Sequence, residues 1–320
     1  MDHAGKYMYK AGIGEHANIQ TYGGKWITYF ITNNGKQAFI RVDKNMNVID
    51  TMRPSADYDT DFHEARIITD SSYYILGQEI LPIDMSQIVS GGRPDAYVIA
   101  NVIEERSFSG NTLFSWRCID HIPVTDAAPD IDLTAAGIDN MHVNSITMAR
   151  DGNIIISARH LSEVIKINQF QFLNDTTDGY FGFSSQHSAL ETADGTILLF
   201  DNGNTKPTVR SRAVEYALDL NAMTARKVFE FSPDPPAYAS SMGSVQELEN
   251  GNILIGYGSG SNRTVAQEVT RDGAIQIEIS NNATIGFAAY RVIKSELYMT
   301  GVFKRFSASG TIPFSKGDSS

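Results

Sequence analysis

The sequence predicts an all-β protein, a six-bladed β-propeller with mostly four-stranded antiparallel blades around a central channel. Helical periodicity is scarce, and short alternating or apolar runs end in Asn, Asp or Gly. A strand–turn–strand phrase recurs as "MARDGNIIISAR", "ETADGTILLFDN" and "ELENGNILIGYG". Its glycines, Gly152, Gly195 and Gly251, lie 43 and 56 residues apart. A period of roughly 40 to 55 residues, with about four strands each, is typical of propeller blades.

Six units follow one another along the chain, and we expect residues 1–320 to form a single domain. The second unit is long and ends in a connector, "PVTDAAPDIDLTAAGIDN", while the third has no clear outer strand. A pair of β-sandwiches would explain the strands but not the period. The expected inner strands begin near residues 16 ("HANIQTY"), 63 ("HEARIIT"), 142 ("HVNSITM"), 187 ("HSALETA"), 243 ("GSVQELE") and 287 ("FAAYRVI").

Composition excludes several classes of protein. The net charge of −11 argues against a nucleic-acid partner, which would require clustered Lys and Arg. No apolar run reaches about 18 residues, so no membrane span is expected. Cys118 is the only cysteine, which excludes an intramolecular disulfide and a cysteine metal cluster.

Histidines mark the beginnings of the predicted inner strands. His16, His63, His142 and His187 each stand at or just before such a strand. The leading ends of these strands meet at one mouth of the channel, so the imidazoles should converge there. His121 and His160 lie near the second and third unit boundaries and are further candidates. A structural role, with both ring nitrogens bonded to the channel wall, is the alternative for each histidine.

A metal or cofactor is not expected at this mouth. Glu64 follows His63 directly, but no second histidine follows at the spacing of a zinc protease. Three converging histidines could still hold a metal with an open position, and that alternative stays open. Arg212 begins an alternating strand and could point into the channel.

Several long motifs resemble the bacterial arylsulfotransferase (aryl-sulfate sulfotransferase) family. They cover roughly residues 60 to 300 in the family's order. The motifs are "FHEARII", "LFSWRCIDHIPVTDA", "DNMHVNSITMARDGNIIISARHLSEVIKIN", "GFSSQHSALETADGTILLFDNGN", "SRAVEYALD" and "MGSVQELENGNILIGYGS". The resemblance implies a six-bladed propeller that moves a sulfuryl group from an aryl sulfate to a phenol, without a metal or a nucleotide donor.

The resemblance also implies roles for particular residues. His142 matches the histidine of an H-x-N-S motif, His187 that of a Q-H motif and Arg212 the arginine of S-R-A-V-E-Y. These three are the expected catalytic residues, the histidines in proton transfer and contact with sulfate oxygens, the arginine in holding the sulfate. The expected substrate-binding residues are His63, Glu64, His121, Asn144, His160, Tyr238 and Ser244.

One feature departs from the family pattern. Its characterised enzymes carry sulfate on a further histidine, C-terminal to these motifs. No histidine follows His187 here, and the corresponding segment offers Tyr238, Ser241 and Ser244. The covalent step is therefore not assigned to a residue.

The leading hypothesis is an arylsulfotransferase-like enzyme that binds a small aromatic molecule, sulfated or not, at the histidine-lined mouth. A non-catalytic propeller that binds a ligand or protein is the first alternative. A propeller enzyme of other chemistry, such as a lyase, cyclase or metal-dependent hydrolase, is the second. Members of the family are commonly exported, so a periplasmic or secreted protein is expected.

Overall fold

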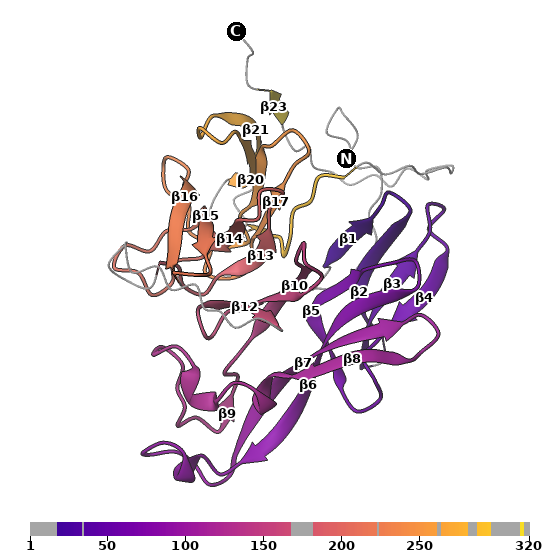
Figure 1. Cartoon of the computed structure of the whole chain (residues 1–320), viewed down its shortest axis with the longest axis vertical. Coiled ribbons are helices and arrows are strands. Elements are labelled where there is room, and N and C mark those ends of the chain that lie inside the picture. Colours follow the sequence, from indigo (N-terminus) through magenta and orange to yellow (C-terminus); the bar gives the residue numbers. More distant parts are fainter. Residues whose placement is uncertain are drawn as a thin grey trace.

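Five of the six β-sheets that the described residues form surround a central channel in chain order, and we call them blades 1 to 5 (Figure 1). The computed structural model describes residues 18–33, 35–167, 182–222, 224–260, 264–280, 287–295 and 314–316. The all-β propeller class is confirmed. Within these residues the only helices are three single 3₁₀ turns, Met85–Gln87, Cys118–Asp120 and Val124–Asp126, and none is long enough to cross a membrane.

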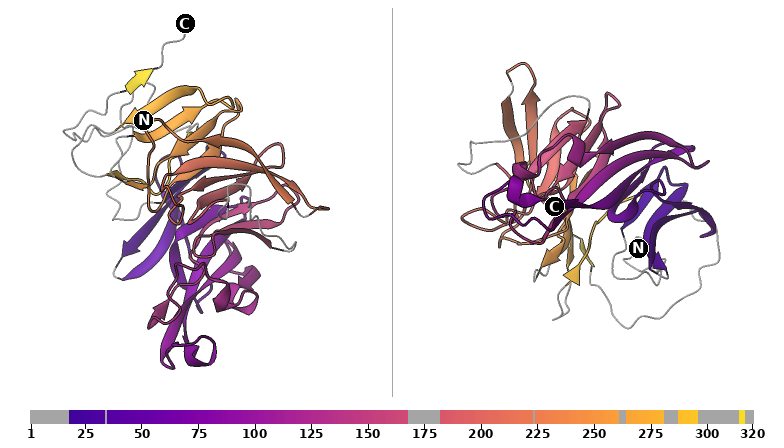
Figure 2. Two further views of the ribbon diagram at one scale, coloured as in Figure 1. Left: turned by 90° about the vertical axis from the view of Figure 1, so that its left-hand side faces the viewer. Right: turned by 90° about the horizontal axis from the view of Figure 1, so that it is seen from below.

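Blades 1, 2 and 4 contain four strands along the main path of the sheet. Blade 1 consists of β1 (Ile19–Tyr22), β2 (Trp26–Asn33), β3 (Lys36–Val42) and β4 (Val48–Met52). Blade 2 consists of β5 (Asp59–Ile67), β6 (Ser72–Ile83), β7 (Ala96–Ser107) and β8 (Thr112–Arg117), with β9 (Gly137–Ile138) parallel to β7. Blade 4 consists of β13 (His187–Glu191), β14 (Ile197–Asp201), β15 (Arg212–Asp219) and β16 (Thr224–Phe231). The long strands β6 and β7 carry blade 2 beyond the rest of the ring (Figure 2).

Blades 3 and 5 depart from four strands. Blade 3 has three described strands, β10 (Val143–Met148), β11 (Ile154–Ala158) and β12 (Glu163–Ile167). The residues expected to lack a clear outer strand, 168–181, lie outside the described residues. Blade 5 consists of β17 (Ser244–Glu247), β18 (Ile253–Gly256), β20 (Thr264–Val269), β21 (Ile275–Ser280) and β23 (Phe314–Lys316).

The prediction of six blades is wrong for the described part of the chain, which forms five. The unit expected from residue 287 forms only the short β22 (Phe287–Ala288), paired with β19 (Ser259–Gly260). Residues 289–295 then run beside β17: the Val292 N–H donates to Ser244 Oγ (2.9 Å) and the Lys294 N–H to Gln246 Oε1 (2.8 Å). Thr21 Oγ1 donates to Ser295 Oγ (2.9 Å), so this segment joins blade 5 to blade 1 without a sheet of its own. The remaining residues of that unit, and His16 with its expected strand start, lie outside the described residues.

The repeated turn phrase has the conformation that the sequence predicts. Gly152, Gly195 and Gly251 have φ angles of 84°, 79° and 81°, in the left-handed region that glycine enters without a steric penalty. In each turn the glycine N–H donates to the carbonyl three residues earlier, as Gly152 does to Ala149 (2.9 Å). The phrase therefore encodes the hairpin between the first two strands of three blades.

The hydrophobic core lies between successive blades. Each blade presents one face to the blade before it and the other to the blade after it, so its strands are apolar on both faces. For example, Ile75 of blade 2 packs toward Phe39 of blade 1, whereas Leu76 packs with Val143 and Ile156 of blade 3. This packing fixes the radial position of the inner strands, and hence of the residues at their ends.

Candidate functional site

The predicted histidines gather at one mouth of the channel because of the antiparallel topology. The beginning of each inner strand and the end of the second strand lie at the same face of the ring. His142 directly precedes β10, His160 lies just beyond the end of β11 and His187 begins β13. In β5 the register shifts between Thr60 and Ala65, and the bulged residues between them include Asp61 and His63. Bulges of this kind re-aim side chains next to functional sites.

Left-handed backbone conformations accumulate at the same mouth. Among the described residues six non-glycine residues have positive φ, and four of them lie just before inner strands or within their first two residues: His142 (48°), Ser185 (53°), Ser188 (57°) and Met242 (63°). Such a conformation costs on the order of 1–3 kcal/mol and persists where surrounding contacts impose it. The clustering indicates a mouth whose side chains are held in fixed positions.

Two aspartate–histidine pairs from neighbouring blades face each other. Asp61 Oδ1 accepts from the His63 N–H (2.8 Å) and from its Nδ1 (2.6 Å). Asp139 Oδ1 accepts from the His142 N–H (3.0 Å), and its Oδ2 accepts from His142 Nδ1 (2.5 Å). The two imidazole rings lie 4.7 Å apart, centroid to centroid, at 67°. Because each carboxylate holds Nδ1–H, each ring keeps Nε2 for other partners.

Arg159 and His160 complete a group that we call the mouth cluster: Asp61, His63, Asp139, His142, Arg159 and His160. The His160 ring lies 4.5 Å from that of His142. His160 Nδ1 donates to the Asp139 carbonyl, and Nε2 accepts from Arg159 Nη1 (2.5 Å). His160 therefore ties the guanidinium to the same aspartate that orients His142.

The electrostatics of the cluster follow from burial and mutual charge. Burial, followed by the charge of His142, lowers the pKa of His160 to about 4, against the opposing effect of Asp139. Burial alone would raise the pKa of Asp139, but the hydrogen bond and charge of His142 outweigh it, so the pKa is lowered. At neutral pH the cluster thus holds a neutral His160 between an ionised aspartate and an arginine.

Arg159 has the contacts expected of an anion-binding group. Among the described residues no carboxylate forms an ion pair with it, and its buried Nε has no hydrogen-bond partner. Burial lowers its pKa against the attraction of Asp130 and Asp139. Its Nη2 makes a 3.4 Å contact with the carbonyl of Ser240. The guanidinium is therefore partly desolvated and still able to receive an oxyanion.

His187 is placed differently from the expectation of a proton carrier. It is 3% exposed, its Nδ1 donates to Asn202 Oδ1 (2.8 Å) and its Nε2 accepts from the Met242 N–H (3.2 Å). Burial lowers its pKa well below the ordinary value, and the charges of His142 and Arg159 add to that effect. With both nitrogens occupied, a neutral His187 joins blade 4 to the beginning of blade 5, which is a structural role.

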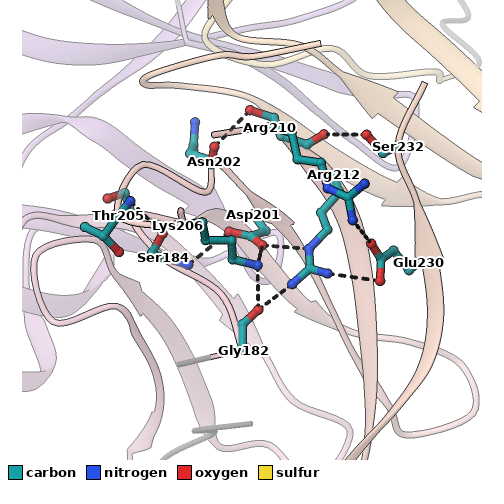
Figure 3. A network of polar contacts seen from close by, with 12 residues as sticks. Gly182, Ser184, Asp201, Asn202, Thr205, Lys206, Arg210, Arg212, Glu230 and Ser232 are labelled. Carbon is teal, nitrogen blue, oxygen red and sulfur yellow. Dashed lines mark hydrogen bonds and ion pairs between the residues drawn. The ribbon is translucent and has the colours of Figure 1, made fainter. Parts of the chain in front are cut away.

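Arg212 does not point into the channel. It is 3% exposed and lies inside blade 4, where Nε donates to Asp201 Oδ2 (2.8 Å) and Nη1 pairs with Glu230 Oε2 (3.0 Å; Figure 3). Its Nη2 also donates to the carbonyl of Gly182. Two carboxylates neutralise the guanidinium and raise its pKa against the effect of burial. The guanidinium that was expected to bind sulfate is thus neutralised by carboxylates inside blade 4.

Only some of the other expected substrate-binding residues lie near the mouth cluster. Tyr238 is half-buried, donates to Asn204 Oδ1 (3.3 Å) and interacts electrostatically with Arg159, so it belongs near the cluster. Asn144 donates to the Gln186 carbonyl (2.8 Å), and its buried Oδ1 has no partner among the described residues. Ser244 is bonded to Val292.

Two of the expected substrate-binding residues lie away from the cluster. Glu64 is fully buried and pairs with Arg291 across the channel (2.9 Å). His121 is exposed and stacks on Trp116 of the outer strand of blade 2, with ring centroids 4.9 Å apart.

Three members of the mouth cluster were not predicted from the sequence: Asp61, Asp139 and Arg159. Each stands one to three residues before a histidine that was identified, in "DFH", "DNMH" and "ARH". A carboxylate shortly before a channel histidine in two successive units was the signal for the aspartates. Arg159 gave none, because an arginine after a strand is usually solvated.

A metal is a possible occupant of this cluster by residue type alone. Asp139, His142 and His160 offer ligand atoms within 4.8 Å of one another. However, Asp139 already binds His142 Nδ1, and Arg159 donates to His160 Nε2. A cation would have to break both hydrogen bonds and lie beside a guanidinium, so the arrangement fits proton transfer and anion binding better.

The chain was compared with curated proteins and with solved structures. No curated protein matches the chain. Among solved structures, the chain is similar to a catalytically inactive virginiamycin B lyase from Staphylococcus aureus with quinupristin, at 10% identity and a TM-score of 0.45, over 84% of this chain and 72% of that one. It is also similar to TolB from Acinetobacter baumannii, at 13% identity and a TM-score of 0.42, over 81% of this chain and 52% of that one.

The family of the chain follows from a sequence match that is independent of these structures. The model of the family described as Arylsulfotransferase (ASST) matches residues 22–282. That range contains the inner strands of blades 2 to 5 and every residue of the mouth cluster. Because the match extends over far more than half of the 320 residues, the chain belongs to the arylsulfotransferase (ASST) family.

Proposed function

We propose that this protein transfers a sulfuryl group from an aryl sulfate to a phenolic acceptor at the mouth cluster. The observation that carries the proposal is Arg159, a partly desolvated guanidinium without a carboxylate partner among the described residues, beside two aspartate-held imidazoles. Membership of the arylsulfotransferase family supports the same chemistry.

The reaction requires charge stabilisation and two proton movements. The bond from sulfur to the donor's phenolic oxygen breaks, and its electron pair leaves on that oxygen. A new bond joins sulfur to the acceptor oxygen, whose proton passes to an imidazole. A proton delivered to the departing phenolate completes the balance, because a phenol has a pKa of about 10 and its anion is a poor leaving group at neutral pH.

The mouth cluster offers a group for each requirement. Arg159 would bind the sulfuryl oxygens, where fixed donors contribute most to the rate. His142 would accept the acceptor's proton on Nε2, since Asp139 holds its Nδ1–H. His63, held in the same way by Asp61, would supply the proton to the departing phenolate. Tyr238 would contact an aromatic ring. A direct transfer of this kind needs no histidine C-terminal to His187.

A ligand-binding propeller without turnover is the second candidate. It is favoured by the placement of His187 and Arg212, two expected catalytic residues whose polar atoms are bonded within the protein. In that case the mouth would bind an aromatic anion and release it unchanged.

An assay with a chromogenic aryl sulfate separates these candidates. The wild type should release the phenol in the presence of a second phenol, and His142→Gln should abolish the release. Release that does not depend on the acceptor would indicate hydrolysis. No release by the wild type, combined with saturable binding of the aryl sulfate, would favour the second candidate and overturn the first.

A further inference from the structure

A cavity of about 530 Å³ opens at the end of the channel opposite the mouth cluster. Its wall includes the later residues of the inner strands, such as Thr147 of β10, Glu191 of β13 and Gln246 of β17, whereas the mouth cluster adjoins the earlier ends. The volume lies within the range of small-molecule sites. The lining is rich in hydroxyl and amide groups, among them those of Gln20 and Thr28.

Arg66 is the distinctive group in this wall. Its Nε is buried and has no hydrogen-bond partner, and no carboxylate among the described residues forms an ion pair with it. The negative charge of Glu64 acts on it, but both Glu64 oxygens already accept hydrogen bonds: Oε1 accepts from Gln20, and Oε2 accepts from Arg291 (2.9 Å). Arg66 and Arg291 therefore share one carboxylate, which leaves Arg66 without an ion pair of its own among the described residues.

Two other ionised groups of the cavity wall form ion pairs. Lys294 pairs with Glu268 (2.6 Å), and Glu247 pairs with Arg271 (2.7 Å). Glu191 accepts from the backbone N–H of Arg150 (2.7 Å) and forms no ion pair among the described residues. A partly buried guanidinium remains charged in proteins, and its desolvated Nε is costly without a hydrogen-bond acceptor, so a ligand that supplies an oxyanion would relieve that cost.

We propose that this cavity is a second binding site, specific for a small polyhydroxylated molecule that carries an oxyanion, such as an acidic sugar. Arg66 binds the carboxylate, sulfate or phosphate, and the surrounding hydroxyl and amide groups bind the hydroxyls. The site is independent of the chemistry proposed at the mouth cluster, which lies at the other end of the channel.

Isothermal titration of the full chain tests this site. The probes are glucuronate, glucose 6-sulfate and glucose 6-phosphate, which distinguish the three oxyanions, with neutral glucose as the control. At least one acidic sugar should bind saturably, and glucose should not. Arg66→Gln should weaken that binding by about tenfold or more, the loss of one charge-assisted hydrogen bond. Arg159→Gln, at the other mouth, should bind as the wild type does.

A second substitution keeps the test valid if Arg66→Gln fails to fold. Met148 lines the cavity and is 51% exposed, so the fold should tolerate a change there. Met148→Glu adds a negative charge and should weaken the acidic sugar, whereas Met148→Gln should not. The proposal is overturned if no acidic sugar binds, if glucose binds equally well, or if Arg66→Gln or Met148→Glu binds as the wild type does.

Discussion

Asp139 binds His142 through both carboxylate oxygens, with Oδ1 on the backbone N–H and Oδ2 on the ring Nδ1, and binds His160 through its carbonyl. Asp139 therefore fixes the backbone and the tautomer of His142, the residue that we assign as the base, and also holds the neighbouring His160 in place. The left-handed φ of His142 is held by the same contact.

Asp139→Asn should lower the rate of sulfuryl transfer by about 10²-fold or more, because an amide can favour the wrong tautomer of His142. The substitution keeps the size of the side chain, so the melting temperature should change little. Steady-state rates across pH 5 to 9 give the measurement, since a positioning role predicts a changed pH profile as well as a lower kcat. Asp151→Asn, which removes a half-exposed partner of Lys166, is the control and should leave both unchanged.

Arg212→Gln should destabilise the protein by about 3–5 kcal/mol, because it leaves Asp201 and Glu230 with less positive charge in a buried network. The transfer rate per folded molecule should remain that of the wild type. The neighbouring Arg210→Gln breaks a more exposed pair with Glu230 and should cost less than about 1 kcal/mol. Urea denaturation of the two variants measures the difference, and equal costs would contradict the structural role of Arg212.

His160 should make the protein less stable in mild acid. Its folded pKa of about 4 lies below the ordinary 6.5, so its contribution is complete above about pH 6.5 and is lost as the pH falls toward 4. The loss between pH 7.5 and 4.5 should be on the order of 2 kcal/mol. Denaturation of the wild type and His160→Gln at both pH values gives the comparison. The variant should lose less stability than the wild type over this interval, and an equal loss would show that His160 titrates normally.

Glu163, at the start of β12, should act in the opposite direction. Burial, and then the charge of Asp126, raise its pKa from 4.5 to about 7. Its contribution is therefore complete below about pH 4.5 and is lost as the pH rises through 7, by roughly 1 kcal/mol after allowance for its partial exposure. The free energy of unfolding of Glu163→Gln, measured relative to that of the wild type, should therefore be higher at pH 8 than at pH 5. A constant difference between the two proteins would contradict the raised pKa.

The sequence predicted the blades better than the site because the two depend on different information. Alternation and Asp-Gly or Asn-Gly turns are local, and they located the starts of β10, β13 and β17 within one residue. The sixth unit was overestimated, since "FAAYRVI" has the pattern of an inner strand but residues 289–295 bond to Ser244 and Gln246 through side chains instead of a ladder.

The sequence did not predict which way the side chains at the ends of the strands point. His142 and His187 occupy equivalent positions before or at inner strands. However, both ring nitrogens of His187 form hydrogen bonds, to Asn202 and Met242, whereas Nε2 of His142 has no partner among the described residues. These partners lie outside the strands, 15 and 55 residues away, so no local pattern distinguishes the two histidines. Arg212 was misplaced for the same reason, because Asp201 reaches it only through the β14–β15 register.

The central claim is that Arg159, and not Arg212, binds the transferred group, and kcat/KM for a chromogenic aryl sulfate with a saturating phenol acceptor tests it most directly. Arg159→Gln and Arg212→Gln are compared with the wild type at a temperature where both remain folded. Loss of one fixed oxyanion donor predicts a fall of about 10²- to 10³-fold for Arg159→Gln and a near-wild-type value for Arg212→Gln. A near-wild-type value for Arg159→Gln, or a larger loss for Arg212→Gln, would contradict the account.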